Sequence, residues 1–320
     1  METVITAESL GLEAEAKLVG RDPFGRYWFN IPGGEKRVYD AKAKQLYRAV
    51  EGADGKSILQ NLVRVRSDGF KIPTVDEWHQ LALKYPEYKV VSNTLLKDYG
   101  VMACMDFIEN QHILERARKL RILEFGHGFN PDVMMHFQSE HEVWGADRDQ
   151  QLHYFKNILN WDGTFSEKVE RYCPKVRFVR ELLGETPSSI PDNYFDVVLS
   201  ISVLEEVGVS VLRSILSAAY TKIAPGGYLI GTHDLCLSHT ERAEEYVQIQ
   251  RDVGFELEFS PDQMTFDCSN VLLENPSVVM RWYQQAHPDD ASRKYVGHYG
   301  TIFTVARKPL RALEGTSSAA

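Results

Sequence analysis

The stretch Arg121-Ile-Leu-Glu-Phe-Gly-His-Gly-Phe-Asn130 decides how the rest of this chain can be interpreted. Its apolar residues Ile122 and Leu123 are typical of a buried strand, and two glycines separated by one residue indicate a tight turn. Pro131 follows and favours the first position of a helix. A strand, a glycine turn and a helix in this order open a nucleotide site at the carboxyl end of a parallel sheet.

The chain after this stretch alternates between strand and helix patterns. This alternation indicates an α/β fold, with a Rossmann-like, mostly parallel seven-stranded sheet and helices on both faces. Helical patterns occupy 209–223 and 241–252 after the stretch, and a further one over 94–119 leads into it. Strands are expected from Ile122 and over 142–146, 175–179, 194–200, 228–232, 254–259 and 300–306.

The first part of the chain differs in composition from the rest. We therefore predict a small N-terminal mixed module over residues 1–95, a main domain over 96–309, and a disordered tail over 310–320. The module could bind substrate, cover the nucleotide site or form the interface of a homo-oligomer.

Local patterns give the module its expected elements. Residues 27–31 and 37–39 are predicted strands joined by a turn, and 41–50 is a predicted helix. Thr74-Val-Asp-Glu77 has the spacing of a capping box, which starts a further helix. The aromatic residues at 24 and 27–29 are expected to form a small core.

Charge and hydropathy exclude several classes of function. The net charge of −9 counts against a protein that binds the phosphate backbone of a nucleic acid, so no nucleic-acid partner is expected. No run approaches the roughly 18 apolar residues of a membrane span. The N-terminus has no signal-peptide pattern, and we expect a cytoplasmic protein. Widely spaced cysteines favour reduced, buried thiols: Cys104, Cys173, Cys236 and Cys268.

Four motifs in a fixed order carry a resemblance to a known family. They are Leu123-Glu-Phe-Gly-His-Gly128, Gly145-Ala-Asp147, Pro191–Val198 followed by Ser202–Val207, and Ile223–Leu229. In this order and spacing the chain resembles the class I S-adenosylmethionine-dependent methyltransferases, most closely the broad group labelled type 11. The similarity covers about residues 96–308. It implies S-adenosylmethionine as the cofactor.

The resemblance assigns expected roles at the cofactor site. Gly126, His127 and Gly128 form the glycine loop, and Glu124 orders that loop and faces the methionine moiety of the cofactor. A buried carboxylate there would also offset the ammonium and sulfonium charges. The resemblance further places Glu181 at the adenine amine and Ser200 in the lining of the cofactor site.

Asp147 is the expected partner of the ribose. It lies 21 residues after Gly126, where the second strand should end beside the first. A carboxylate at that point can accept hydrogen bonds from both ribose hydroxyls. Asp149 is the alternative if the strand runs two residues further, and a helix cap is the structural alternative for Asp147 itself.

The glycine loop departs from the family pattern at Asn130, where a third glycine is common. Asn tolerates left-handed dihedrals better than most residues, so the loop can still form. A dinucleotide-binding loop would need glycine at the next position, where Pro131 stands. An NAD-linked enzyme is therefore the lesser alternative.

Transfer of a methyl group to a hydroxyl gains from a general base, and His suits neutral pH. His233, after the fifth strand, is the preferred base, with His127 and Glu206 as further catalytic candidates. No dense ligand motif supports a metal, although Glu205, Glu206, His233, Asp234 and His239 are suitable ligand types. The insertion from 260 to 298 is expected to lie over the site and help select the substrate.

These patterns predict a methyltransferase that acts on a small-molecule or sugar-like acceptor at oxygen. A catalytically inactive, methyltransferase-like binding module is the main alternative, since no base is unambiguous.

Overall fold

The computed structural model describes most of the chain. The described residues are 5–10, 12, 15–34, 36–42, 45–51, 57–67, 69–88, 94–110, 119–128, 130–148, 165–236, 241–259, 262–267, 271–274 and 299–310.

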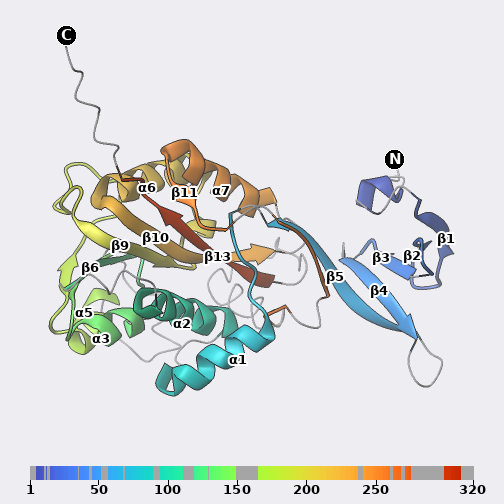
Figure 1. Ribbon diagram of the computed structural model, residues 1–320, viewed down its shortest axis with the longest axis horizontal. Helices are drawn as coiled ribbons and strands as arrows, with labels where there is room; N and C mark the ends of the chain where they lie inside the picture. Colours follow the sequence, from blue (N-terminus) through green and yellow to red (C-terminus); the bar gives the residue numbers. More distant parts are fainter. Residues whose placement is uncertain are drawn as a thin grey trace, which may run out of the picture.

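A seven-stranded sheet forms the centre of the molecule (Figure 1). Its order is β11-β13-β10-β9-β6-β7-β8, and the strands from β10 to β8 run parallel. The last strand, β13, runs antiparallel to β10 and places β11 at the edge. The strands are β6 (Arg121–Phe125), β7 (Glu142–Ala146), β8 (Arg177–Val179), β9 (Phe195–Ile201), β10 (Ile223–Cys236), β11 (Glu256–Leu257) and β13 (Tyr299–Arg307). The predicted fold class is confirmed.

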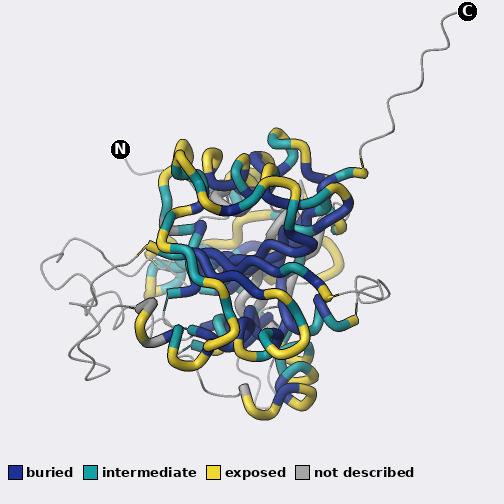
Figure 2. The backbone as a smooth tube through the Cα atoms, turned by 90° about the vertical axis from the view of Figure 1, so that its left-hand side faces the viewer, coloured by how far each residue is buried: buried dark blue, intermediate teal, exposed yellow. Residues whose placement is uncertain are grey.

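Helices cover both faces of this sheet, and each face has its own apolar core (Figure 1). One face packs against α1 (Val75–Lys84), α2 (Leu95–Asn110), α3 (Asp132–Phe137) and α5 (Phe165–Tyr172). The other packs against α6 (Val209–Lys222) and α7 (Glu241–Val253). Figure 2 shows the central strands buried between these layers, with the exposed residues on the outside. Short 3-10 turns occur at η1 (Glu8–Leu10), η2 (Pro86–Tyr88) and η3 (Leu204–Glu206).

The N-terminal part forms a second, antiparallel sheet of order β1-β2-β3-β4-β5-β12, whose first strands extend away from the large sheet (Figure 1). Its strands are β1 (Lys17–Arg21), β2 (Arg26–Asn30), β3 (Lys36–Asp40), β4 (Gln45–Glu51), β5 (Ser57–Ser67) and β12 (Asp262–Asp267). The sixth strand comes from the insertion late in the chain and pairs with β5. This pairing crosses the predicted boundary at residue 95, and that boundary stays a prediction.

The helix predicted over 41–50 is wrong, because β4 occupies 45–51. In β4, Tyr47 pairs with Val38 of β3 on one side and with Asn61 of β5 on the other. Two flanking strands supply cross-strand contacts that override a local helical pattern. The expected aromatic core is also only partly formed, since Phe29 is buried but Phe24 is exposed.

The capping box predicted at Thr74 is confirmed. Its side chain accepts the N–H of Glu77 at 3.2 Å, and the Glu77 carboxylate accepts the N–H of Thr74 at 3.0 Å. The resulting helix α1 packs beside α2 and contributes Ala82 to the core of the main fold. Of the four cysteines, Cys104 and Cys173 are buried free thiols, as expected.

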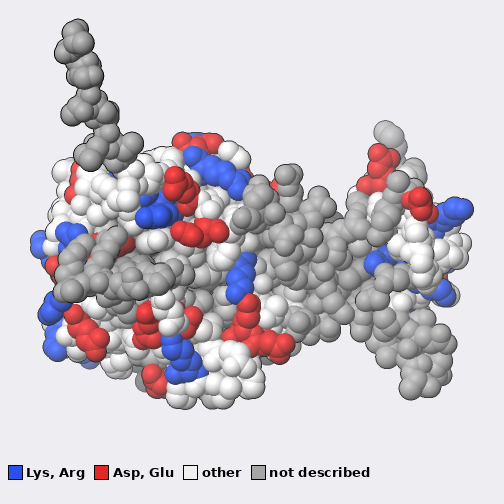
Figure 3. Space-filling model, viewed as in Figure 1, with Lys and Arg blue, Asp and Glu red and all other residues white. Residues whose placement is uncertain are grey.

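The surface carries mixed charge. On the face seen in Figure 3, basic and acidic side chains of the described residues alternate over the main domain. Within the part of the chain that the structure describes, no helix is both long and apolar enough to cross a membrane.

Candidate active site

The glycine loop joins β6 to α3 at the carboxyl edge of the sheet. Gly126 has φ +67°, and its N–H donates to the carbonyl of Ala146 on β7 at 2.8 Å. A Cβ at Gly126 would lie 2.7 Å from both Cγ atoms of Val203. Gly128 has φ +53°, and no atom of the described residues lies within 4 Å of a Cβ built there. The loop therefore closes against the fold at its first glycine and leaves room for a ligand at its second.

Asp147 lies directly after β7 and contacts this loop. Its Oδ2 accepts the backbone N–H of Gly128 at 2.7 Å. The side chain is half-buried, so the carboxylate keeps the capacity to accept further hydrogen bonds from a ligand. The alternative residue, Asp149, lies outside the described residues.

His127 turns its ring into the fold. Its Nδ1 lies 3.0 Å from the carbonyl oxygen of Gly128, and a carbonyl can only accept, so Nδ1 carries the proton. Burial lowers the pKa of His127, although the nearby Asp147 acts in the opposite direction. The ring also packs edge-on against Phe178. These contacts fix the shape of the loop.

Glu124 is buried on the sheet face that α2 and α3 cover. In the part of the chain that the structure describes, its Oε2 has no hydrogen-bond partner. Burial raises the pKa of the Glu124 carboxyl to about 8, and the charges of Asp132 and Asp147 add to the shift. Burial raises the pKa of the Asp132 carboxyl to about 6, and the charge of Asp98 adds to the shift. A hydrogen bond from Asn130 acts in the opposite direction. The floor of the loop thus contains buried carboxyl groups, and burial raises the pKa values of Glu124 and Asp132.

Two of the buried carboxyl groups beneath the loop, Asp98 and Asp132, were not predicted from the sequence to be site residues. Asp98 precedes Val101, Met102 and Met105 by three, four and seven residues, so it lies on the apolar face of its own helix. A carboxylate on a buried face is a signal that could have found it. Asp132 follows a proline at a helix start, where an acidic residue is ordinary and carries no such signal.

Glu181 and Ser200 lie where the sequence predicted, after β8 and near the end of β9. The Glu181 carboxylate accepts hydrogen bonds from Ser188 Oγ at 2.6 Å and from the Ser189 N–H at 3.1 Å. Burial works against ionisation of Glu181, but these hydrogen bonds hold its pKa below the usual range. The Ser200 hydroxyl is buried, and no described residue forms a hydrogen bond with it. Asn130 Oδ1 accepts the N–H of Asp132 at 3.0 Å.

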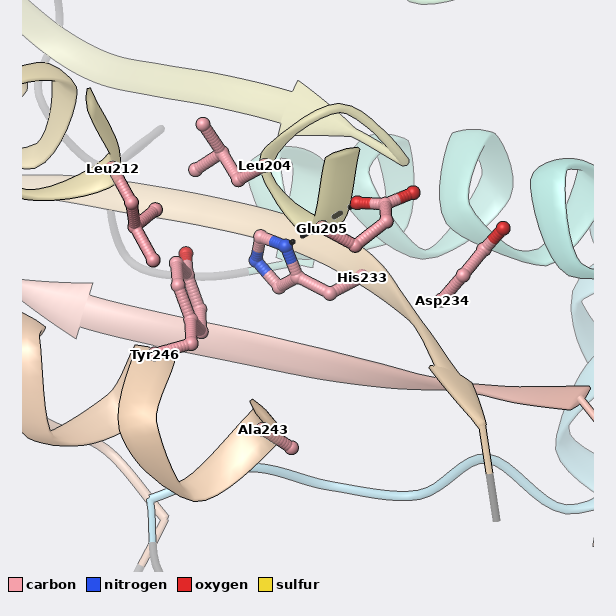
Figure 4. A pocket seen from close by; sticks show the side chains of 7 residues that line it. All are labelled: Leu204, Glu205, Leu212, His233, Asp234, Ala243 and Tyr246. Atoms are coloured by element: carbon pink, nitrogen blue, oxygen red, sulfur yellow. Dashed lines mark ion pairs between the residues drawn. The ribbon is translucent and has the colours of Figure 1, made fainter. Parts of the chain in front are cut away.

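A second group of polar side chains lies near the ends of β9 and β10. The prediction that His233 and Asp234 follow the fifth strand is wrong, because β10 continues to Cys236 through its pairing with β13. Ser202 has φ +52°, and its hydroxyl donates to Asp234 Oδ1 at 3.1 Å. In Figure 4 the carboxylates of Glu205 and Asp234 extend to one side of His233, whose ring points toward Tyr246. These residues line a small pocket of about 20 Å³, completed by Leu204, Leu212 and Ala243. That volume holds about one water molecule.

His233 sits at the back of this pocket. Burial lowers its pKa to about 3, and the charge of Asp234 offsets only part of the shift, so the ring is neutral at pH 7. Its Nδ1 lies 3.7 Å from Glu205 Oε2, and its buried Nε2 has no hydrogen-bond partner among the residues that the structure describes. The ring centroid lies 3.7 Å from that of Tyr246. The preferred base of the sequence analysis is therefore enclosed behind Glu205.

Other predicted residues receive less support. Glu206 lies in η3, but its side chain is outside the description, as are His239 and the aromatic and His residues of the insertion at 282–298. Among the described residues, no group of three or more His, Cys, Asp or Glu side chains is arranged to hold a metal ion.

Comparison with known proteins identifies the domain that carries these features. Residues 123–231 match the model of a family described as a methyltransferase domain. These residues match a methyltransferase domain. The match begins in β6 and ends in β10, so this methyltransferase domain contains the glycine loop, Asp147 and Ser202.

Solved structures resemble the methyltransferase domain at low identity. The [4+2]-cyclase SpnF is 15% identical, with a TM-score of 0.40 over 65% of this chain and 81% of that one. A TehB-like methyltransferase from Corynebacterium glutamicum is 15% identical, with a TM-score of 0.39 over 73% and 98%. A geranyl diphosphate methyltransferase in complex with its substrate and sinefungin is 10% identical, with a TM-score of 0.38 over 59% and 71%. No curated protein matches the chain.

The residues of the methyltransferase domain fit its cofactor, S-adenosylmethionine. The cofactor is cationic at its amino and sulfonium groups, and Glu124 offers a buried carboxyl oxygen that has no hydrogen-bond partner among the described residues. The free space beside Gly128 lets a ligand approach the backbone, next to the half-buried Asp147 carboxylate. Both features lie at the carboxyl ends of β6 and β7, where parallel sheets of this type bind ligands.

Proposed function

We propose that the protein transfers a methyl group from S-adenosylmethionine to a hydroxyl oxygen of a small, sugar-like acceptor in the cytoplasm. The observation that carries this proposal is the position of Glu205 and Asp234. Glu205 follows β9, Asp234 lies within the neighbouring strand β10 near its end, and both line one pocket that also contains the neutral His233 (Figure 4).

Carboxylates at this place favour a hydroxyl acceptor for two reasons. They accept hydrogen bonds from hydroxyl groups without donating any, which suits a polyol or sugar. They would also stabilise the protonated form of an amine, and a protonated amine has no lone pair with which to accept a methyl group. Oxygen is therefore the accepting atom that this acidic pair supports best.

We propose that the Glu205 carboxylate removes the proton of the acceptor hydroxyl. His233 does not suit this role, because it is enclosed and ionises only near pH 3. In this proposal His233 positions Glu205, whose Oε2 lies 3.7 Å from the ring Nδ1. His127 keeps the glycine loop in shape through Gly128. Glu206 stays a candidate for contact with the acceptor.

The bound cofactor supplies an electrophilic methyl group on a sulfonium leaving group. The residues proposed to hold it are Gly126 and Gly128 at the loop, Glu124 at the methionine end, Asp147 at the ribose, Glu181 at the adenine and Ser200 in the lining. Placement of the acceptor oxygen in line with the methyl group accounts for much of the rate, and removal of its proton adds to it.

Two measurements test the proposal. Calorimetry should detect S-adenosylhomocysteine binding, and Asp147→Ala should weaken it, because the variant loses both a ligand contact and the loop anchor at Gly128. Formation of S-adenosylhomocysteine across a panel of polyols, sugars and amines should then be fastest with hydroxyl acceptors. Absence of binding overturns the cofactor assignment, and faster turnover of amines overturns the choice of oxygen.

A methyltransferase-like module that binds without catalysis is the second candidate. The depressed pKa and enclosure of His233 favour it, because the preferred base is not a competent base at neutral pH. Cofactor binding without turnover on the whole panel would support this candidate over the first.

A further inference from the structure

Ser202 has an unusual backbone conformation directly after β9. Its φ of +52° lies in the left-handed region, which is unfavourable for most residues other than Gly, Asn and Asp. Gly would adopt the same conformation without strain. A serine kept in this conformation beside a candidate site therefore points to a role of its side chain.

The Ser202 side chain holds a carboxylate of the pocket near the ends of β9 and β10. Its hydroxyl donates to Asp234 Oδ1 at 3.1 Å, and only 8% of Ser202 is exposed. The Ser202 N–H donates to the carbonyl of Thr232 on β10 at 2.9 Å, so the backbone that carries the hydroxyl is itself fixed. Asp234 is half-buried and lines the pocket. A carboxylate has about four lone-pair sites, so a bond from Ser202 is compatible with further bonds from the hydroxyl groups of an acceptor.

The same conformation sets the path of the chain after β9. Val203 follows directly and packs against Gly126 of the glycine loop. The next turn, η3, brings Glu205 Oε2 to 3.7 Å from His233 Nδ1. The backbone at Ser202 therefore carries the contact with the loop and the proposed base, while the hydroxyl holds the second carboxylate of the pocket.

We propose that Ser202 is a positioning residue, whose hydroxyl fixes the Asp234 carboxylate for hydrogen bonds with the hydroxyl groups of the methyl acceptor. The strained backbone is retained because a relaxed glycine at this position would leave Asp234 without that bond. This inference rests on the proposed function, because it requires an acceptor bound at Asp234.

Steady-state kinetics of Ser202→Ala, with the fastest polyol or sugar of the acceptor panel, tests the proposal. The variant loses only the hydroxyl, so KM for the acceptor should rise about tenfold, as expected for one hydrogen bond to a charged group. The turnover number and the affinity for S-adenosylhomocysteine, measured by calorimetry, should stay at their wild-type values, because Glu205 and the contact at Val203 remain. An unchanged KM overturns the inference and leaves the proposed function intact. Absence of turnover by the wild type with every hydroxyl acceptor overturns the proposed function, and the inference with it.

Ser202→Gly separates the hydroxyl from the backbone. Gly also lacks the hydroxyl but adopts the positive φ without strain. This variant should therefore show the same rise in KM as Ser202→Ala, with a melting temperature about 2–4 °C higher than that of Ser202→Ala. If Ser202→Ala does not fold, Ser202→Gly alone decides the result for KM, and a wild-type KM in it overturns the inference.

A double-mutant cycle tests whether Ser202 acts through Asp234. The variant Ser202→Ala/Asp234→Ala should lose no more kcat/KM than Asp234→Ala alone, because the side chain that the hydroxyl positions is already absent. Additive losses would show that the two residues act independently, which overturns the inference.

Asn193→Gly is the matched control. Asn193 has φ +50°, its Oδ1 accepts a hydrogen bond from Lys308 Nζ at 2.9 Å, and it lies before β9, at the opposite end of that strand from Ser202. The variant removes a left-handed side chain and its hydrogen bond away from the pocket, so KM for the acceptor should not change. A rise in KM equal to that of Ser202→Ala would be a general effect of lost stability and would overturn the positioning role.

Discussion

Two buried titratable clusters lie at the carboxyl edge of the same sheet, one on each face. The cluster beneath the glycine loop contains carboxyl groups, and burial raises the pKa of Glu124 to about 8. The pocket near the ends of β9 and β10 contains an imidazole, and burial lowers the pKa of His233 to about 3. The same desolvation drives both groups to their neutral forms. A neutral carboxyl group can still lose its proton and pair with an incoming cation. An imidazole with a pKa near 3, in contrast, cannot keep a proton taken from the hydroxyl of the methyl acceptor at pH 7.

Val203 connects the two clusters. It precedes η3, which bears Glu205, and its side chain packs against Gly126 of the glycine loop. A change in either region can therefore reach the other through this contact, which makes it possible to test how far the two are independent.

The largest expected effect is on turnover, in Glu205→Gln. If Glu205 receives the acceptor proton, the amide lowers the turnover number by about 10²–10⁴-fold, the usual contribution of a general base. The affinity for S-adenosylhomocysteine should not change, because the cofactor contacts lie on the other side of Val203. Steady-state kinetics and calorimetry on the same preparation measure both. Glu256→Gln, at an exposed site on β11, is the control, and equal turnover in the two variants would remove Glu205 from the mechanism.

The contact at Val203 is tested by a pair of glycine variants. Gly126→Ala and Gly128→Ala both place a side chain at positive φ, a strain of about 1–2 kcal/mol each. Only Gly126→Ala also drives a Cβ into Val203, so it should lose about 1–3 kcal/mol more in the free energy of unfolding. Urea denaturation measures the difference. The double variant Gly126→Ala/Val203→Ala should recover most of it, and equal losses in the two single variants would show that the loop is not packed as described.

The opposite pKa shifts predict opposite effects of pH on stability. The folded state binds a proton at Glu124 that the unfolded chain releases above its ordinary pKa near 4.5, so this contribution falls as pH rises from about 5 to about 8. His233 contributes stability above its ordinary pKa of 6.5, which is lost as pH falls toward 3. In denaturation at several pH values, the stability of Glu124→Gln relative to wild type should therefore rise between pH 5 and 8. A constant difference would mean that Glu124 ionises normally.

The smallest effect is expected on the far side of His233, in Tyr246→Phe. The Tyr246 hydroxyl accepts a hydrogen bond from Gln250 Nε2 at 2.8 Å in a buried environment. Its loss should cost about 1–2 kcal/mol of stability, as for other buried hydrogen bonds. Turnover should be preserved, because the ring that packs on His233 remains. Tyr172→Phe, at an exposed tyrosine, is the matched control, and a large loss of turnover in Tyr246→Phe alone would place this hydroxyl in the reaction.

Residues that end strands and begin helices were enough to predict the main fold. Gly126, Gly128 and Pro131 mark the turn after β6, and the capping box at Thr74 starts α1 where the spacing predicted. The helix predicted over 41–50 failed because its pattern was local, while the strand that formed there pairs with two neighbours. Strand pairing depends on residues distant in the chain, as β5 and β12 show.

The sequence by itself determined the class of fold and the place of the cofactor loop, because glycine, proline and apolar periodicity act through the local backbone. It also supplied Asp147 at the correct position beside that loop. Only the tertiary structure decided the state of the ionisable groups. Asp98 joins Glu124 and Asp132, and His233 is enclosed behind Glu205, because helices on opposite faces bury them. Burial depends on contacts between distant segments, and it is burial that sets the charge of these side chains.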